Sequence, residues 1–495
     1  MQDNDIINLL GIKDSTIKIL SVATKDTEKT VEFEKRIELH YCPLCGCRMH
    51  SKGVYRRRVN HPILQDGYRL VMIFHQRRWQ CSNKSCREIV ADEVSFIDKR
   101  KRNTNITDWL IVKAFKDFSL TAAQIARRFN VSDTYALHTF DRYVDMKRRD
   151  LTEVICVDEV HLEIPRVCNY ALVIQDFISG EPLDLVVSRR KEITEPYFAH
   201  IPAGERARVK YIVSDMYGPF IDYSKTYFPK ALSAVDSFHV IKMINQKIKK
   251  YILQLIRNLN DIDVARQQKL EQELGHHVDL VHSREYKIIK HYQWLILSNN
   301  RKIDYGHMRY DRRFGRYIYP SDIETEMFKI DPNLKDIRDL KEVYIKFNDD
   351  YVGDPEGARK GLKDVIKKYQ NCRYRMFNEV ADSLSNHFEE IITSFILVKK
   401  YGAEGFILRR LSNGPMESLN RVPKDMKRNA RGYRNFDHIR NRFLFAKRKN
   451  AEMLGHPKPW REVCFNTGLK RGPYKKTIKS PKLKRVIKVS WGMIF

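Results

Sequence analysis

The alternation of apolar and polar positions predicts a β-rich region near the middle of the chain. Runs of apolar and β-branched residues typical of strands alternate there with turn signals and with segments of helical period. The strand candidates are residues 154–157, 170–176, 182–188, 211–213 and 231–235. Helices are expected at about 192–200, from Phe220 and from His239. An aspartate follows two of the strands directly: Asp158 after the first and Asp215 after the fourth.

The order of these elements predicts how the two aspartates are placed. Three strands at hairpin spacing, then helix, strand, helix, strand and helix, is the order of a ribonuclease-H-like catalytic domain. In that fold the first and fourth strands are neighbours, so Asp158 and Asp215 should meet at the sheet edge where open α/β sheets bind ligands. Two adjacent carboxylates remain ionised only if a cation lies between them, and hard oxygen ligands favour Mg²⁺. Taken singly, each aspartate is more typical of a turn or a helix cap.

A third acid, Glu417, lies far along the chain. It follows Asn413-Gly-Pro415, a helix-start signal in which the proline suits the first turn. Asn420, three residues later, shares its helix face. Residues 245–405, between the second acid and the third, are charged, helical in period and poor in strand signals, which predicts a large all-helical insertion. A surface glutamate on an amphipathic helix is the alternative for Glu417 alone.

The first hundred residues carry paired cysteines. A short helix is expected at 6–10 and strand-like runs follow within the 1–40 N-terminal segment. Two cysteine pairs then bracket a hairpin whose strand 68–74 begins after the turn signal Gln65-Asp-Gly67. Such pairs predict a zinc-ribbon domain, because each tight turn delivers two thiolates to one tetrahedral ion. The ligand candidates are Cys42, Cys45, Cys81 and Cys86, with Cys47 as a possible replacement for Cys45. Buried or coincidental cysteines are the alternative.

A helix-turn-helix DNA-binding domain is predicted after the basic linker at 99–102. Helices are expected at 107–118, 120–129 and 133–143, and Ser132 is well placed to cap the last of them. Two short helices joined by a tight turn place the second in the major groove of DNA. The candidate DNA contacts are Arg127, Arg128, Thr134, Tyr135 and His138. An ordinary helical hairpin is the alternative.

Charge narrows the class of partner. The chain has 495 residues, with 91 Lys+Arg against 62 Asp+Glu and a net charge of +29, which favours a polyanion. No apolar run reaches the ~18 residues of a membrane span and no signal-peptide pattern is present, so nucleic acid is preferred over a membrane surface. Nine cysteines without a secretion signal indicate reduced thiols or metal ligands, and we expect a cytoplasmic, nucleoid-associated protein. Further basic residues follow Glu417: Lys424, Arg428, Arg431 and the tail 451–495.

The ordered set of motifs resembles the bacterial insertion-sequence DDE transposases of the IS-L-three family. The likeness includes Cys42-Pro-Leu-Cys45, Val157-Asp-Glu-Val160, Ser214-Asp-Met-Tyr-Gly-Pro-Phe220, Val235-Asp-Ser-Phe-His-Val240 and Ser412-Asn-Gly-Pro-Met-Glu417-Ser-Leu-Asn420. The resemblance implies a catalytic triad of Asp158, Asp215 and Glu417 that holds two Mg²⁺ or Mn²⁺ ions. Asp236 and His239 match a signature with a supporting role. Asn420 is expected to support the site as a positioning group on the helix of Glu417. Pro423 departs from the family's usually uninterrupted helix and leaves the position of Lys424 open.

The expected function is therefore that of a DNA transposase. It would bind the terminal inverted repeats of an insertion sequence, cut one strand and join that strand to target DNA. The protein would act as a homodimer on DNA, and each chain would hold one structural Zn²⁺. A catalytically inactive DNA-binding regulator and a stand-alone ribonuclease-H-like nuclease are the alternatives. The expected domains are 1–40, the ribbon at 41–98, the helix-turn-helix at 99–150, the catalytic core at 151–244 and 406–450, the insertion at 245–405 and the tail at 451–495.

Overall fold

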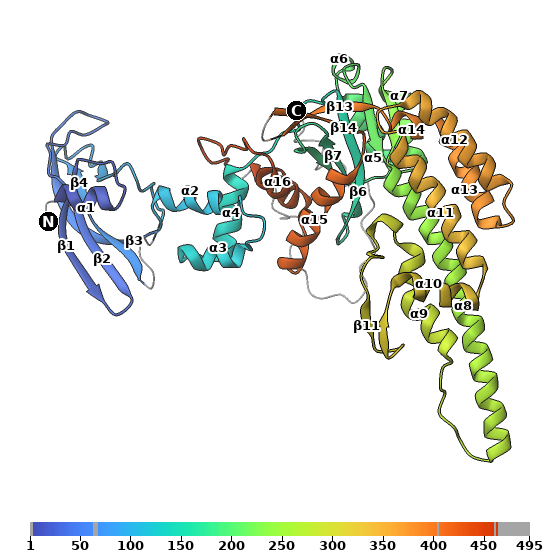
Figure 1. Cartoon of the computed structure of the whole chain (residues 1–495). Helices are drawn as coiled ribbons and strands as arrows, with labels where there is room; N and C mark the ends of the chain where they lie inside the picture. Colours follow the sequence, from blue (N-terminus) through green and yellow to red (C-terminus); the bar gives the residue numbers. More distant parts are fainter. Residues whose placement is uncertain (1–2, 63–67, 403–404, 460–461, 464–495) are drawn as a thin grey trace, which may run out of the picture. The chain divides into compact units, whose positions relative to one another are not determined.

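The computed structural model describes residues 3–62, 68–402, 405–459 and 462–463 (Figure 1). The chain divides into two compact units. Unit 1 comprises residues 1–148, 160–171 and 421–495, and unit 2 comprises 149–159 and 172–420. The predicted turn at 65–67 and most of the basic tail lie outside the described residues. Each unit is described by itself.

The N-terminal part of unit 1 is a single five-stranded sheet. Its strand order is β1-β2-β4-β3, with β5 paired to β4. The elements are α1 (Asp3–Leu9), β1 (Ile17–Lys25), β2 (Glu28–Lys35), β3 (Met49–His61), β4 (Arg69–Cys81) and β5 (Ile89–Ala91). Strand β2 runs parallel to β4 and the stacked rings of Phe33 and Phe74 join them, with centroids 4.9 Å apart. The segment 1–40 therefore shares one sheet with the cysteine-bearing strands.

Three short helices follow this sheet, and a fourth from the C-terminal part of the chain packs with them. They are α2 (Asn105–Ala114), α3 (Ala122–Phe129), α4 (Asp133–Tyr143) and α16 (Phe436–Lys447). A capping box formed by Thr121 and Gln124 starts α3, and Ser132 Oγ accepts from the Tyr135 N–H to cap α4, as expected. Arg442 of α16 is 2% exposed and donates to the Leu120 carbonyl. The group of three short helices is thus completed by a helix about 300 residues later in the chain.

Most of the second sheet, including both aspartates, belongs to unit 2, while residues 160–171 of β6, β7 and their connection are assigned to unit 1. The strands of this sheet are β6 (Val154–Ile164), β7 (Cys168–Asp176), β8 (Pro182–Val186), β9 (Tyr211–Ser214) and β10 (Leu232–Val235). The order is β10-β9-β6-β7-β8, and β9 is parallel to both its neighbours. The intervening helices are α5 (Lys191–His200), α6 (Ala203–Arg206) and α7 (Gly218–Tyr227). The first and fourth strands of the domain, β6 and β9, are adjacent as expected.

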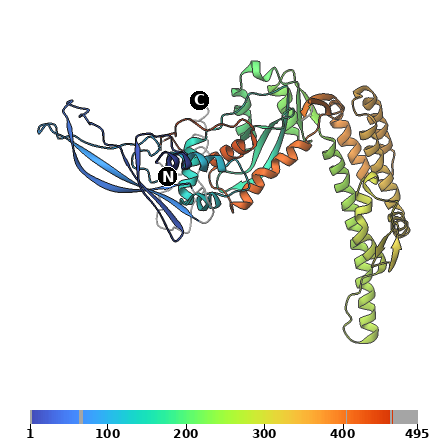
Figure 2. The same cartoon turned by 60° about the vertical axis from the view of Figure 1, so that its left-hand side comes forward.

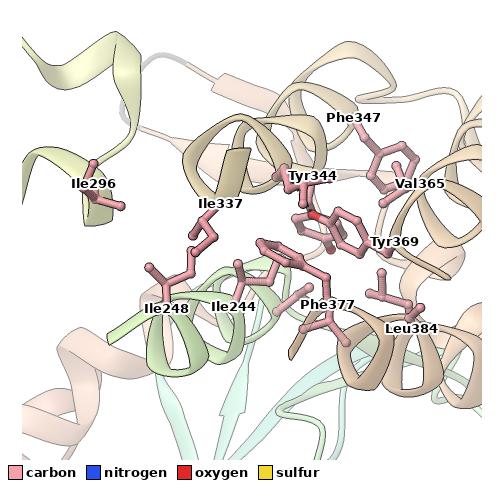
Figure 3. Packing of buried hydrophobic residues seen from close by; sticks show 14 of the residues in the cluster. Ile244, Ile248, Ile296, Ile337, Tyr344, Phe347, Val365, Tyr369, Phe377 and Leu384 are labelled. Atoms are coloured by element: carbon pink, nitrogen blue, oxygen red, sulfur yellow. Dashed lines mark hydrogen bonds between the residues drawn. The ribbon is translucent and has the colours of Figure 1, made fainter. Parts of the chain in front are cut away.

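A large helical block follows β10 and begins with α8 (Ser237–Leu274), a single helix of 38 residues. In both views the far end of α8 extends past the other helices and the chain returns to α9 through a loop (Figures 1 and 2). The other helices are α9 (Arg284–Leu297), η1 (Asn300–Lys302), α10 (Pro320–Ile330), α11 (Asn333–Asp350), α12 (Pro355–Gln370), α13 (Arg375–Asn386) and α14 (Phe388–Thr393). Figure 3 shows side chains of four of them directed toward one another, among them Ile244, Tyr344, Tyr369 and Phe377.

The block is not all-helical, contrary to expectation. A small hairpin, β11 (Arg309–Asp311) and β12 (Arg316–Ile318), interrupts it. The intervening turn uses Gly315 at φ +63°, and the rings of Tyr310 and Tyr317 pair across the strands at 5.6 Å. Three-residue strands are too short to produce a clear alternation in the sequence. A second hairpin, β13 (Leu397–Gly402) and β14 (Gly405–Arg410), precedes α15 (Gly414–Asn429).

Membrane crossing is excluded for each helix in the described ranges by its length or its polarity.

Candidate functional site

The strand register aligns Asp158 with Asp215. In the parallel pair β6–β9, Cys156 lies opposite Val213. Two residues further along the chain from this pair are Asp158 and Asp215. Asp215 directly follows β9, as expected, whereas Asp158 lies within β6, which continues to Ile164 instead of ending before the aspartate. Both side chains are half-buried. Asp215 Oδ1 also accepts the Tyr217 N–H at 3.1 Å, so this carboxylate starts the turn into α7 as well.

Helix α15 is anchored to this edge of the sheet at two points. The Asn413 N–H, just before the helix, donates to Asp236 Oδ2 at 3.0 Å, and Asn420 Nδ2 donates to Asp158 Oδ2 at 2.9 Å. Asp236 follows β10 and Asp158 lies on β6, with β9 between them. Seven helical residues rise ~10.5 Å, which matches two strand spacings of ~9.5 Å in total. The segment 413–420 therefore spans the distance from the end of β10 to Asp158 on β6.

Glu417 lies between these two anchors. It is four residues after Asn413 and three before Asn420, so all three share one helix face. The Asn420 side chain on this face contacts Asp158, and β9, which leads to Asp215, lies between β10 and β6. In the described ranges no cationic side chain forms an ion pair with Asp215 or Glu417. Three carboxylates would offer oxygen ligands, which suit a hard divalent cation.

The carboxylates are spaced more widely than the cysteines discussed below. Among the described residues, the only metal-ligand group whose ligand atoms all lie within 4.8 Å of one another consists of cysteines. Like charges favour such separation unless a cation is bound between them.

Asp236 and His239 lie at the start of α8. Asp236 is 2% exposed, and its Oδ1 accepts the Phe238 N–H while its Oδ2 accepts the Asn413 N–H. One carboxylate therefore caps α8 and fixes the start of α15. His239 Nε2 is buried without a hydrogen-bond partner among the described residues. The sequence placed Asn413 in a helix-start signal with Gly414-Pro415, but it did not reveal the contact of Asn413 with Asp236.

The four candidate zinc ligands come together at one end of the β3–β4 hairpin. Cys42 Sγ lies 3.6 Å from Cys86 Sγ, Cys45 Sγ lies 3.4 Å from Cys81 Sγ, and all four sulfurs are within 4.8 Å of one another. Zn–S bonds of ~2.3 Å in a tetrahedron require sulfurs ~3.8 Å apart, so the cluster is compatible with Zn²⁺. Cys47 lies outside this group.

Local backbone structure explains how the two cysteine turns form. Gly46 adopts φ +71°, which lets the Cys42 N–H reach the Cys47 carbonyl at 2.8 Å. In the second turn the Asn83 N–H points at Cys81 Sγ at 3.4 Å. The Cys47 N–H and the Cys81 thiol lower the pKa of Cys45 to about 6. A lowered pKa favours the thiolate, the form that binds zinc.

The five candidate DNA contacts of the helix-turn-helix differ in exposure. Arg127, Arg128 and Thr134 are exposed, and His138 is half-buried. Tyr135 is turned inward: its hydroxyl donates to Asp108 Oδ1 at 2.6 Å. Tyr135 therefore stabilises the contact of α2 with α4, a role that its sequence position did not reveal.

The second half of α15 carries a basic groove. Pro423 does not end the helix, which continues to Asn429, so Lys424 keeps a defined place two turns after Glu417. A groove of about 560 Å³ is lined by His161, Lys424, Lys427, Arg428, Arg431 and Gly432. Lys427 is paired with Glu163 at 2.8 Å, whereas Lys424 and Arg431 are exposed.

Comparison with known proteins agrees with this architecture. Residues 155–443 match the sequence model of the IS-L-three group of DDE proteins, a family described as transposase. The chain is also 21% identical over 434 residues to the transposase for insertion sequence element IS1001 of Bordetella parapertussis. This alignment covers 85% of the present chain and 90% of that relative. The matched family region contains Asp158, Asp215 and Glu417.

Proposed function

The chain belongs to the IS-L-three family of DDE transposases, and from this premise we propose that it binds the terminal inverted repeats of an insertion sequence and catalyses metal-dependent strand cleavage and strand transfer. The observation that carries the proposal is the arrangement of α15. Its two hydrogen bonds, from the Asn413 N–H to Asp236 and from Asn420 to Asp158, tie the segment that carries Glu417 to the end of β10 and to β6, and this supports a site in which Glu417 joins the two aspartates. Like charges repel, so a glutamate distant in sequence is not expected beside two aspartates unless a cation binds between the three carboxylates.

Asp158, Asp215 and Glu417 would hold the catalytic ions. Two bound Mg²⁺ or Mn²⁺ ions would supply an activated nucleophile and would stabilise the charge on the leaving oxygen of the phosphodiester. The chain's own contribution is positioning. Asn420 orients the Asp158 carboxylate by donating to its Oδ2, and Asp236 holds the start of α15 through the Asn413 N–H. Neither Asn420 nor Asp236 needs to touch the DNA in this scheme.

Recognition of DNA is assigned to the exposed cations and polar groups of unit 1. Arg127, Arg128, Thr134 and His138 would contact the terminal repeat, with Tyr135 supporting their helix from inside. Lys424, Arg428 and Arg431 would contact phosphates, as their convergence on one groove supports. These contacts suit a duplex better than an acidic protein surface, because a phosphate backbone presents evenly spaced charges along a groove.

The four-cysteine cluster would hold one structural Zn²⁺. Its role is to hold the two cysteine turns against the β3–β4 hairpin, since ligation and folding are coupled in small thiolate sites. A chelator should release one zinc per chain and increase amide exchange in residues 42–47 and 81–86, while exchange in α4 stays unchanged. Retention of normal exchange rates after complete zinc loss would exclude the structural role.

Two transposon ends must be held together for coordinated transfer, so we propose a homodimer on DNA. Light scattering of the complex with paired ends should give two chains per pair of ends. A catalytically competent complex containing a single chain would refute the dimer.

The decisive experiment uses a DNA duplex copied from the end that borders the gene, a supercoiled target plasmid and Mg²⁺. A transposase gives joined product, a stand-alone nuclease gives cut product only, and an inactive regulator gives bound DNA only. Joined product supports the proposal, and either of the other outcomes replaces it with the corresponding alternative.

Matched variants connect the activity to the proposed site. Asp158→Asn, Asp215→Asn and Glu417→Gln should each abolish cutting and joining but leave end binding within about twofold, because recognition is assigned to other residues. Asp222→Asn, which changes an exposed acid on α7, is the control and should be fully active. Full activity of the Glu417→Gln protein would remove Glu417 from the site.

A further inference from the structure

The hairpin β13–β14 exposes three large apolar side chains in succession. Phe406, Ile407 and Leu408 are 57%, 52% and 58% exposed. Within the described ranges they form the only run of three consecutive exposed large apolar residues. Such a run is unfavourable in water unless it serves a contact.

The base of the hairpin is firmly held, which separates it from an ordinary mobile loop. Arg410 donates to the carbonyls of Ser394 and Asn348 at 2.9 and 3.0 Å, and its guanidinium lies 3.6 Å from the ring centroid of Phe395. On the opposite strand, Lys400 Nζ lies 5.1 Å from the ring of the buried Phe177. The exposed residues are therefore presented by a support fixed through both strands.

Alternation along the strands gives the hairpin one mixed apolar and cationic face. Phe406 and Leu408 point to the same side because they are two residues apart. Leu408 lies opposite Lys399, whose Nζ is 4.7 Å from the Phe406 ring centroid. This face combines a ring, an aliphatic side chain and a positive charge.

The hairpin shares its support with the carboxylate edge of the sheet. Helix α14, which leads into β13, packs on β10. After β14, Leu411 is 1% exposed and the Asn413 N–H is bound to Asp236. Only seven residues separate Arg410 from Glu417. The apolar face and the proposed metal ligands are thus parts of one unit.

We propose that Phe406 and Leu408 form a wedge that enters the DNA base stack beside the scissile phosphate, with Lys399 on the flanking phosphate. This inference rests on the proposed function and specifies how the same site prepares its substrate. Apolar side chains of this type enter base steps and unstack them in other DNA-binding proteins. A stacked duplex end keeps the terminal strand away from the carboxylates. Unstacking one base step would let that strand reach them.

A second copy of the chain is a less suitable occupant of this face. Lysine is depleted in the cores of protein interfaces, yet lysines lie opposite both Leu408 and Ile407. Lysines on a short exposed strand also discourage pairing with another strand edge. DNA suits both features of this face, because its phosphates can pair with the lysines and its base faces can contact the apolar side chains.

The test reports base stacking directly. The full-length protein is mixed with the duplex copied from the element's end, in which the fluorescent adenine analogue 2-aminopurine replaces one base at a time near the cut site. The first measurement is made without divalent metal, so that it does not depend on catalysis. We expect a several-fold rise in fluorescence at one or two adjacent positions and none further inside the duplex.

The variant Phe406→Ala/Leu408→Ala should lose most of this rise while binding the end within about threefold. With Mg²⁺ its cutting rate should fall by about tenfold on intact duplex, and a mismatch at the responsive position should restore the rate to within about twofold of the unchanged protein. Leu274→Ala is the matched control, because Leu274 is equally exposed at 57% but lies at the end of α8. It should behave like the unchanged protein.

The outcomes distinguish this proposal from the function on which it rests. A double variant with normal fluorescence and normal cutting overturns the wedge and leaves the transposase intact. Altered sedimentation of the double variant without a fluorescence change overturns it in favour of a contact between copies. A fluorescence rise that depends on Phe406 and Leu408 supports the wedge even if no cut or joined product forms, in which case the proposed activity alone fails.

Discussion

The Asn420 side chain shows how one amide can control a carboxylate without being a ligand. It is 5% exposed, donates from Nδ2 to Asp158 Oδ2 and is 3.4 Å from the Glu159 carbonyl. A buried hydrogen bond to a charged group contributes about 1.5–3 kcal/mol to stability. Here the bond also fixes the orientation of the Asp158 carboxylate. Asn420 is therefore interpreted as a positioning residue.

Replacement of Asn420 separates positioning from folding. Asn420→Ala should lower the single-turnover cutting rate by roughly tenfold to a hundredfold with end affinity unchanged. Asn420→Asp should be slower still, because it replaces the donor with a like charge beside Asp158. Gel-based cutting assays and end-binding titrations measure the two quantities. Equal rates for the Ala variant and the unchanged protein would contradict the assignment.

A buried histidine links the stability of the N-terminal sheet to pH. His61 is 6% exposed; its Nδ1 lies 3.0 Å from Thr104 Oγ1 and its Nε2 lies 3.0 Å from the Leu10 carbonyl. Burial lowers the pKa of His61 to about 4 from an ordinary value of 6.5. Between these values the unfolded chain binds more protons than the folded one, so stability increases with pH. The contribution is complete above pH 6.5 and is lost as the pH falls toward 4.

Urea unfolding of the sheet, followed by amide exchange in β3 and β4, should therefore show a loss of about 3 kcal/mol between pH 6.5 and 4. His61→Gln provides the control. It lowers stability at pH 7 but should remove this part of the pH dependence, while any contribution from the cysteine thiolates remains. An identical pH dependence in both proteins would show that the imidazole does not contribute.

At the scale of elements, α16 connects the end of the chain to the helix-turn-helix. Phe445 is 4% exposed with its ring 5.8 Å from that of Phe140 on α4, and Lys116 donates to the carbonyls of Phe445 and Arg448. His438 Nδ1 lies 2.6 Å from Asp141 Oδ1. Helix α4, the proposed recognition helix, is thus held by residues that are distant from it in the sequence.

Phe445→Ala should destabilise this module by about 3–5 kcal/mol through the cavity it leaves. We expect faster amide exchange in α4 and weaker end binding, although Phe445 is buried and touches no DNA. Asn450→Ala, at an exposed position just beyond α16, should change neither. Normal end affinity in the Phe445 variant would indicate that α16 is dispensable for recognition.

At the scale of the whole molecule, the net charge of +29 makes electrostatics the main source of DNA affinity. End binding should weaken steeply as salt rises, because each phosphate contact releases condensed counterions. The triple variant Lys424→Ala/Arg428→Ala/Arg431→Ala should reduce the slope of log affinity against log salt by up to about 3, at ~0.9 for each contact. Lys18→Ala/Lys25→Ala, two exposed lysines on β1, is the control and should leave the slope unchanged. Equal slopes in all three proteins would exclude the groove from DNA binding.

Features that depend on residues close together in the sequence could be predicted from it. The apolar run before Asp215, the Ser132 cap of α4 and the paired cysteines depend on neighbouring residues, and the structure shows each of these elements where it was expected. The strand before Asp158 also begins where it was expected, but it continues through Asp158 to Ile164. The family follows from the same ordered motifs. Local patterns predict local structure because turns, caps and strand alternation involve residues within a few positions of one another.

Contacts between distant segments were decided only by the tertiary structure. The parallel pairing of β2 with β4, the inward turn of Tyr135 and the packing of α16 on α4 each depend on a partner remote in sequence. So does the bond from Asn413 to Asp236, 177 residues apart, which fixes the start of α15. No local pattern encodes such pairs, because each is selected by the simultaneous packing of several elements. The sequence by itself indicated which acids are candidates for the site. Only the tertiary structure showed that Asn413 and Asn420, on either side of Glu417, contact Asp236 and Asp158.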